Sequence, residues 1–558
     1  MTVTISPTNE KVEQIRPTEI LCQILQFVVE SDGVKALLPS SHVSVRWRRA
    51  ALSDSSLWTT IYLSQTPPPL LDMVLPRTGN QLLTVHADHP DLERHAEIWA
   101  LVNRFQELHY SASLQNLAPF LASLGPAPNL KVLHLRPAEG VLVDAEELVS
   151  GITIQNIFSG RLPSLRNLVL TNTAIWPTGL FKNLTRFECG VSSHFPISPA
   201  HLFDALRESC LIESLRVVGC CVPISGPEVP PVVLSSLKNC TMVGEGVAAL
   251  IRFIAVPATA LVQLGKTYTD NWDGFPDFNK HCVGPGLRIL GEVSVVSFSI
   301  KDDGARLRAR NDRGGALDVK VYGLYYLSGQ PLSFATFIRS SFECWRACPG
   351  LKTAKEFTLY MERDGVWGPD ESTYNALNLV RLISNLPGIE EAKLHGIPPL
   401  EFSSILGCLS RGPKVKLRCP NLKRLDIESS PLRSPRLLLA GLGKLLATRK
   451  EVGAPFQSVT VKVRCEMLIP ATEHCALLTT WEGLVGGGVR LEYEQIEVKK
   501  LLKRRHPPED GEDEDDADED EGGEVVDGEV YAGDPSDCVG WDGWPENWPK
   551  TVEEMRGQ

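Results

Sequence analysis

The chain lacks any long apolar run, since no window approaches 18 uncharged apolar residues. We therefore expect no transmembrane helix. The N-terminal segment, MTVTISPTNEKVEQIRP, has no apolar core of the signal-peptide type, so we do not expect secretion. The 14 cysteines include no Cys-x-x-Cys pair, which argues against a zinc site of that spacing. We expect reduced, mostly buried thiols in a protein of the cytoplasm, the nucleus or both.

The chain also lacks the short motifs that mark common catalytic sites. Gly486-Gly487-Gly488 is not followed by the Lys-Ser/Thr of a phosphate-binding loop, and Gly244-Glu245-Gly246 has no third glycine. No Gly-x-Ser-x-Gly elbow is present. The sequence therefore predicts no catalytic residues and no cofactor, and we do not expect an enzyme.

One group of histidines and aspartates lies close together in the sequence and could bind a metal ion: His86, Asp88, His89, Asp91 and His95. Pro90 interrupts their spacing, and neither a helix nor a strand would bring the three rings together. We interpret the segment as an exposed polar loop and predict no metal site.

Charge is distributed unevenly along the chain. The net charge is −12, but residues 509–558 contain 20 Asp or Glu and 2 Lys or Arg, which leaves +6 for residues 1–508. At 558 residues the chain is too long for one compact core unless it is a repeat array. The sequence thus predicts a mildly basic folded body with an acidic tail.

The segment from Ile15 to Leu63 predicts a small helical unit. Arg16-Pro17-Thr18-Glu19 is a typical helix start, and an apolar stripe follows it. The stripe consists of Ile20, Leu21, Ile24, Leu25 and Val28. A second helix is indicated by Val43, Trp47 and Ala50 or Ala51, with arginines around it. Ser56-Leu57-Trp58 then leads into a β-like piece at residues 60–63.

This pattern resembles an F-box. The matching elements are Pro-x-Glu-Ile-Leu-x-x-Ile-Leu at residues 17–25, Arg46-Trp47-Arg48, and Ser56-Leu57-Trp58. The resemblance implies a Skp-type adaptor as partner and, through it, a cullin–RING ubiquitin ligase. The residues that would hold or form the adaptor interface are Pro17, Ile20, Leu21, Ile24, Leu25, Val45, Trp47, Leu57 and Trp58. Some of them must build the motif's own core, and the sequence does not separate the two sets. The alternative is a helical hairpin without this function.

From about residue 126 a loose repeat follows the F-box-like unit. Asn129–Leu135 and Ser164–Leu170 each have leucine at positions one, four and six when counted from Leu130 and Leu165. Related segments begin at Leu184, Ile212, Ile389, Leu422 and Phe456, often just after a proline. This spacing is typical of leucine-rich repeats, in which a short strand is followed by a return segment. Return helices fit at Pro199–Glu208 and Tyr374–Asn385, and a further helix fits at Ala96–Leu108.

Residues 284–345 are less repeat-like. Val293–Ile300 and Ala316–Tyr322 alternate as strands do, with the charged turn Lys301–Gly304 between them. They could form a hairpin or two degenerate repeats, and we favour degenerate repeats.

The order of these parts resembles F-box proteins with divergent leucine-rich repeat-like regions, of the type expanded in fungi. The fold class that we predict is α/β, with a small helical F-box, an irregular leucine-rich repeat-like solenoid and a disordered acidic tail. The predicted boundaries are 1–14 disordered, 15–63 F-box-like, 64–125 connector and N-terminal cap, 126–500 solenoid, and 501–558 basic run and acidic tail. Strand residues between the buried positions would line a concave binding face: His134, Arg136, Val169, Thr171, Arg216, Asp426 and Glu428.

The end of the chain leaves two alternatives open. The basic run Lys499–Arg505 could be a nuclear import signal or the last turn of a helix. Trp541, Trp544 and Trp548 could form a docking motif or cap the solenoid. For the whole protein we predict a substrate receptor of a cullin–RING ligase, which binds an unknown target protein, no membrane and no nucleic acid. The alternative is a non-degradative interaction scaffold whose acidic tail binds basic partners.

Overall fold

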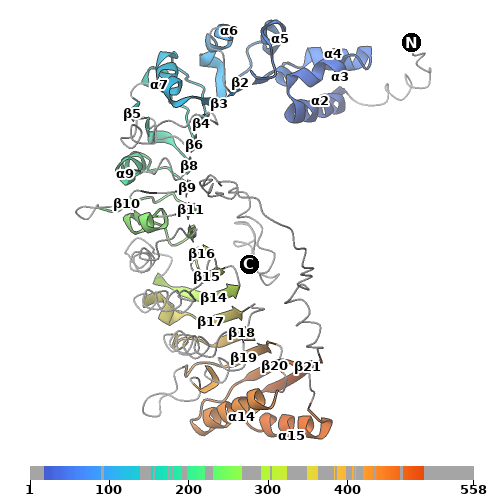
Figure 1. The fold of residues 1–558 in the computed structure, drawn as a ribbon, viewed down its shortest axis with the longest axis vertical. Helices are drawn as coiled ribbons and strands as arrows, with labels where there is room; N and C mark the ends of the chain where they lie inside the picture. The colour runs from blue at the N-terminus through green and yellow to red at the C-terminus, as the bar shows by residue number, and fades with distance from the viewer. Residues whose placement is uncertain are drawn as a thin grey trace, which may run out of the picture. The chain divides into compact units, whose positions relative to one another are not determined.

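A computed structural model gives the fold of the chain (Figure 1). It describes residues 18–88, 94–137, 153–154, 157–171, 176–177, 181–190, 198–219, 221, 230–244, 246–266, 291–301, 304–322, 349–361, 383, 386–397, 405–407, 409, 419–430, 432, 435–465 and 469–495. The predictions for residues 1–14 and 501–558, the basic run and the three tail tryptophans lie outside them. The chain divides after Pro257 into two compact units, unit 1 before that point and unit 2 after it.

Unit 1 begins with short helices. They are α2 (Thr18–Asp32), η1 (Val34–Ala36), α3 (Leu37–Ser41), α4 (Val45–Ser53) and η2 (Ser55–Trp58). Gly33, with φ of +72°, follows α2 and allows the sharp change of direction there. The Ser44 side chain accepts a hydrogen bond from the Trp47 amide and caps α4, and Asp54 caps η2 in the same way. The two predicted helices are confirmed, while η1 and α3 between them were not predicted.

The rest of unit 1 is built on a ladder of parallel strands. In sheet order they are β1 (Thr60–Tyr62), β2 (Leu83–Asp88), β3 (Phe105–Ala112), β4 (Val132–Pro137), β6 (Asn167–Thr171), β8 (Arg186–Gly190), β9 (Ser214–Val218) and β11 (Asn239–Val243). Along these strands buried and partly exposed residues alternate, as the period of two requires, except in β3, where a register shift and three successive buried residues interrupt the pattern. One face of the ladder is therefore apolar core and the other is polar.

Short segments connect these strands. The helical ones are α5 (Pro68–Val74), η3 (Leu75–Thr78), α6 (Ala96–Trp99), η4 (Val102–Arg104), α7 (Leu114–Ser123), η5 (Ile157–Gly160), η6 (Phe181–Asn183), α9 (Pro199–Glu208) and η7 (Ala248–Phe253). Two small parallel pairs also occur, β5 (Thr153–Ile154) with β7 (Trp176–Pro177), and β10 (Val232–Val233) with β12 (Ile254–Ala255).

Several predictions for unit 1 are confirmed, and two need correction. Strands β4, β6, β8 and β9 and helix α9 lie where the sequence predicted them. The helix predicted at Ala96–Leu108 is wrong, because α6 ends at Trp99 and β3 begins at Phe105. Pairing of β3 with β2 and β4 overrides the helical spacing of its apolar residues. The ladder also begins at β1, well before residue 126, where we placed the first repeat.

Unit 2 contains nine strands among its described residues. In sheet order they are β13 (Leu261–Lys266), β16 (Ala316–Tyr322), β15 (Gly304–Asn311), β14 (Val293–Lys301), β17 (Glu356–Met361), β18 (Glu391–Ile397), β19 (Arg424–Ser429), β20 (Ser458–Cys465) and β21 (Gly488–Gln495). The helical segments are η9 (Pro349–Thr353), α14 (Arg436–Glu451) and α15 (Ala471–Glu482). The strands predicted near Ile389, Leu422 and Phe456 are confirmed as β18, β19 and β20. The helix predicted at Tyr374–Asn385 lies almost wholly outside the described residues.

The degenerate repeats favoured for residues 284–345 are wrong. Strand β15 runs antiparallel to both β14 and β16, so the three strands form a meander. Lys301 at the end of β14 pairs with Gly304 at the start of β15, and residues 302–303 of the predicted charged turn lie outside the described residues. Strand β14 also pairs in parallel with β17, which returns the sheet to parallel order. No helix among the described residues has the length and hydropathy needed to span a membrane.

Candidate functional site

The helical unit at the start of the chain packs around a core of its own. Leu21 and Leu25 on α2 are buried, and so are Leu57 and Trp58 on η2. The Trp58 Nε1 atom donates a hydrogen bond of 2.7 Å to the Ala51 carbonyl. These four residues of the predicted adaptor set hold the unit together and do not lie at its surface.

Other residues of the predicted set lie at the surface. Ile20 is 41% exposed and Val45 is 72% exposed, while Ile24 and Trp47 are partly buried. Pro17 lies outside the described residues. The structure therefore separates the residues of the predicted set that form the core of the unit from those that lie at its surface.

Three exposed apolar side chains in this unit were not predicted. Phe27 is 72% exposed, Val43 is 55% exposed and Leu52 is 48% exposed. A signal for Phe27 was present, because Ile20, Ile24 and Phe27 follow helical spacing on a stripe beside that of Leu21 and Leu25. An apolar stripe that does not face the core indicates a surface that another protein covers.

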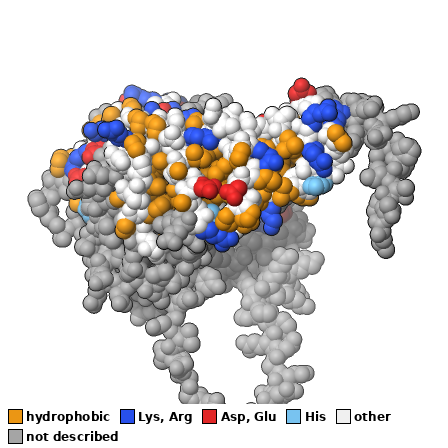
Figure 2. Space-filling model, turned by 90° about the horizontal axis from the view of Figure 1, so that it is seen from above, with side chains coloured by type: hydrophobic (Ala, Val, Ile, Leu, Met, Phe, Trp, Pro, Cys, Tyr) orange, Lys and Arg blue, Asp and Glu red, His pale blue; other side chains and the backbone are white. Residues whose placement is uncertain are grey.

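We call Ile20, Phe27, Val43, Val45 and Leu52 the exposed apolar set. Arg48 and Arg49 of α4 are exposed in the same unit. Figure 2 shows hydrophobic side chains mixed with Lys and Arg over the face of unit 1 seen from above. Such a mixture suits a protein partner that offers both apolar and acidic groups.

Strand β1 joins the helical unit to the sheet of unit 1. It pairs in parallel with β2, and the Tyr62 ring stacks on the His86 ring at 4.3 Å between centroids. The Leu63 amide donates to the His86 carbonyl at 2.8 Å. The Arg77 guanidinium, from η3, lies 5.1 Å from the centre of the Trp58 ring. The helices and the first strands therefore form one continuous packed structure.

A row of rings crosses the polar face of unit 1 at one register position. It comprises Tyr62, His86, His109 and His134 on β1, β2, β3 and β4. The exposed loop predicted around His86 is wrong for two of its histidines, because His86 lies within β2 and His95 is buried. Burial, with a smaller contribution from His109, lowers the pKa of His86 to about 4, so this ring is neutral at pH 7.

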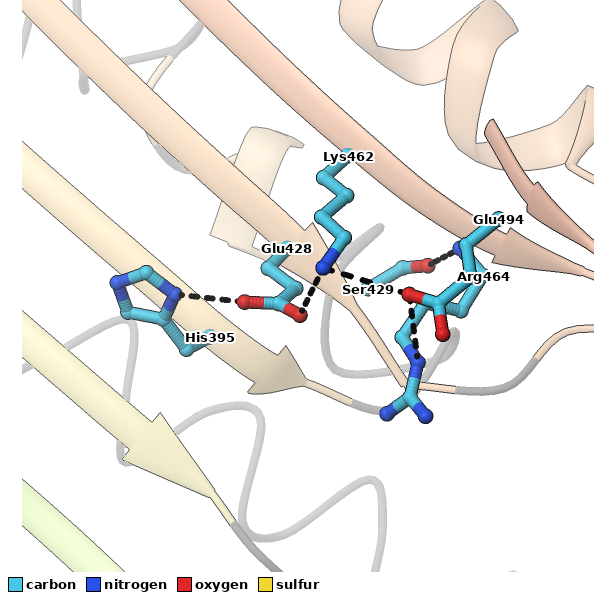
Figure 3. A network of polar contacts seen from close by, with 6 residues as sticks. All are labelled: His395, Glu428, Ser429, Lys462, Arg464 and Glu494. Atoms are coloured by element: carbon cyan, nitrogen blue, oxygen red, sulfur yellow. Dashed lines mark hydrogen bonds and ion pairs between the residues drawn. The ribbon is translucent and has the colours of Figure 1, made fainter. Parts of the chain in front are cut away.

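The polar face of unit 2 carries a chain of ion pairs (Figure 3). Glu428 on β19 lies between His395 on β18, at 3.4 Å, and Lys462 on β20, at 3.3 Å. Lys462 also contacts Glu494 on β21 at 3.3 Å, and Arg464 lies 3.5 Å from the same carboxylate. Burial alone would raise the pKa of Glu428, but hydrogen bonds from Lys462 and His395 outweigh it and hold that pKa below its usual value.

Removing one cation from this network should cost little stability. Lys462 is 41% exposed, and exposed ion pairs are worth about 0 to 1 kcal/mol each. We expect Lys462→Met to change the free energy of unfolding by less than about 1 kcal/mol in urea denaturation. Val461→Ala, at the buried neighbouring position, should lower the free energy of unfolding by more. A larger loss in Lys462→Met than in Val461→Ala would show that the network is structural.

The residues predicted to line the polar face lie on it. His134 and Val169 pair across β4 and β6, and Asp426 and Glu428 alternate with the buried Leu425 and Ile427 of β19. Positive and negative side chains are interspersed on the faces of both units. The charges therefore do not define a ligand of one sign.

Comparison with known proteins adds one finding to this geometry. A family model described as F-box-like matches residues 17–64. The match covers the helical unit and β1, within a few residues of the predicted limits 15–63. No curated protein matches the chain. The chain thus carries an F-box-like domain at its N-terminal end, followed by a mixed α/β region with a large sheet.

Proposed function

We propose that the protein is a substrate-receptor subunit of a cullin–RING ubiquitin ligase. The observation that carries the proposal is the F-box-like domain at residues 17–64, because F-box domains bind Skp-type adaptors. The exposed apolar set supports it. Side chains such as Phe27 and Val45 are more than two-thirds exposed, which is costly in water unless a partner covers them.

In this proposal the strands after the F-box-like domain form an irregular leucine-rich repeat-like solenoid whose polar face binds the target protein. The parallel register of β1 to β11 and the alternation of buried and polar residues support a repeat architecture. The protein itself catalyses no reaction, since ubiquitin transfer belongs to the partner subunits. It acts in the cytoplasm, the nucleus or both, without binding a membrane.

The test is complex formation between the full chain and a purified Skp-type adaptor, followed by size-exclusion chromatography with light scattering. We expect a stable complex with one copy of each protein. Addition of the cullin–RING subunits and ubiquitin-loading enzymes should then give ubiquitin transfer to proteins held by the chain. If the full chain and adaptor elute separately at micromolar concentrations, the receptor proposal fails and the interaction scaffold replaces it.

A further inference from the structure

Two imidazole rings on the polar face of unit 1 bring nitrogen atoms close together. His109 on β3 and His134 on β4 are register partners in the parallel ladder. Their Nδ1 atoms lie 3.4 Å apart, and their ring planes are inclined by 72°. The two rings therefore meet at a nitrogen edge rather than by stacking of their faces.

This separation is that of two ligands on one metal ion. Zinc–imidazole bonds are about 2.0–2.1 Å long, and at a tetrahedral angle two such nitrogens lie about 3.3–3.4 Å apart. An ion placed between the Nδ1 atoms of His109 and His134 would meet both at bonding distance without a backbone movement.

The other nitrogen of each ring already has a polar neighbour. The His109 Nε2 atom lies 3.7 Å from a Glu107 carboxylate oxygen, and the His134 Nε2 atom lies 3.2 Å from the Thr171 hydroxyl. Histidines that bind metals characteristically direct their second nitrogen to such an oxygen, which fixes the tautomer and the ring orientation. His134 thus has the outer hydrogen bond expected of a metal ligand, and His109 has a carboxylate nearby, beyond hydrogen-bond distance.

Ring stacking holds His109 in place. Its ring lies 4.2 Å from that of His86 with an interplanar angle of 11°, and His86 stacks in turn on Tyr62. Because each ring comes from a neighbouring strand at the same register, the position of His109 is fixed by the sheet. Pre-positioned ligands lose little conformational entropy when they bind an ion.

We propose that His109 and His134 bind one divalent transition-metal ion of the class that favours imidazole, such as Zn²⁺ or Ni²⁺, through their Nδ1 atoms. Among the described residues, no group of three or more His, Cys, Asp or Glu could hold a metal, so water completes the coordination. Access is open, because the His109 side chain is 32% exposed.

Metal binding needs only a change of tautomer. Without metal, a proton on His134 Nδ1 can be donated to His109 Nδ1, while the Thr171 hydroxyl donates to His134 Nε2. When the ion binds, that proton moves to His134 Nε2, which then donates to the Thr171 oxygen. The hydroxyl serves in both states because it can donate and accept, and no net proton is released.

The test is isothermal titration of the full chain with Ni²⁺ at pH 7, with exposed thiols blocked. We expect one site in the native protein that is absent in His109→Ala and in His134→Ala. Thr171→Val, which keeps both imidazoles, should weaken binding by about 10–100-fold, and Thr171→Ser should restore it. His395→Ala is the matched control, because His395 is a partly exposed strand histidine of unit 2, and it should leave the site unchanged.

Two results would overturn the proposal. One is the absence of any Ni²⁺ site in the native chain. The other is retention of the same site when both His109 and His134 are replaced by alanine. Melting temperatures measured without metal identify any variant that fails to fold, and the Thr171→Val and Thr171→Ser pair then carries the test, because both imidazoles remain present.

Discussion

Phe27→Asp and Val45→Asp, each made alone, should weaken binding of a Skp-type adaptor by at least about 100-fold, while the melting temperature stays close to that of the native chain. Both side chains are 72% exposed, so a carboxylate there stays in water in the free protein. In the complex the same carboxylate would be buried without a partner, at a cost of several kcal/mol. Titration of the adaptor into each full-length variant measures the effect.

Two comparisons make this prediction specific. Leu437→Asp replaces a side chain of α14 that is 81% exposed, and it should leave adaptor binding unchanged because it lies in unit 2. Leu21→Asp should also abolish binding, but by unfolding the helical unit, since Leu21 is 3% exposed. Ile24 is partly buried, so its exposure lies between that of Leu21 and that of Phe27. Full adaptor affinity in both Phe27→Asp and Val45→Asp would mean that the exposed apolar set has another role.

Arg449→Met should lower the melting temperature of unit 2 by roughly 10 °C, from a loss of about 3–5 kcal/mol. Arg449 lies on α14 with no exposed surface. Its guanidinium donates to the carbonyls of Ala454, Cys419 and Leu422 at 3.1, 3.0 and 2.8 Å. It also lies 4.6 Å from the centre of the Phe456 ring.

The size of this effect follows from what the truncation leaves behind. Each buried polar group that loses its partner costs about 1–3 kcal/mol. The Ala454 and Leu422 carbonyls lose their hydrogen bonds from the guanidinium, and the Cys419 carbonyl keeps only the bond from the Leu422 amide. Burial lowers the pKa of Arg449, but a guanidinium remains charged at pH 7, so its hydrogen bonds are charge-assisted.

Two further variants test the assignment by differential scanning fluorimetry. Arg449→Lys should recover little, because an ammonium group cannot reproduce the planar fork that reaches several carbonyls. Arg436→Met on the same helix should have almost no effect, since Arg436 is 68% exposed and pairs with Glu473 at the surface. Equal melting temperatures for Arg436→Met and Arg449→Met would contradict the structural role given to Arg449.

Much of the fold could be predicted from the local sequence, because the periodicity of apolar side chains indicates whether a segment forms a helix or a strand. Helix α9 has the predicted bounds Pro199–Glu208, with proline at its first position and an apolar stripe behind it. The leucine spacing placed β4 and β6 because alternation on a half-buried strand has a period of two. Each of these elements can therefore be predicted from its own residues alone.

Strand β15 could not be predicted in the same way. Its sequence, GARLRARN, places Arg306 and Arg308 at alternate positions, which suggests an exposed charged segment. In the fold both arginines are buried beside Asp318 of β16, and Arg306 binds its two carboxylate oxygens. The hydropathy of the sequence does not reveal an ion pair between residues on different strands. The histidine row was missed for a similar reason, since register between distant strands brings its rings together.

The candidate adaptor surface was predicted only in part. Sequence spacing placed Leu21, Leu25, Ile20 and Ile24 on neighbouring stripes of one helix, but it did not show which stripe faces the core. The packing of α2 against α4 and η2 decides this, and it leaves Ile20 and Phe27 outside.

Hydrogen–deuterium exchange of the full chain with and without a Skp-type adaptor tests the central claim most directly. We expect slower exchange in peptides that cover α2 and α4, within residues 18–58, and no change in strands β6 to β11 of unit 1. This pattern would assign the adaptor to the F-box-like domain and leave the polar faces available for a target protein. Unchanged exchange throughout residues 18–58, or protection confined to the strands, would contradict the account.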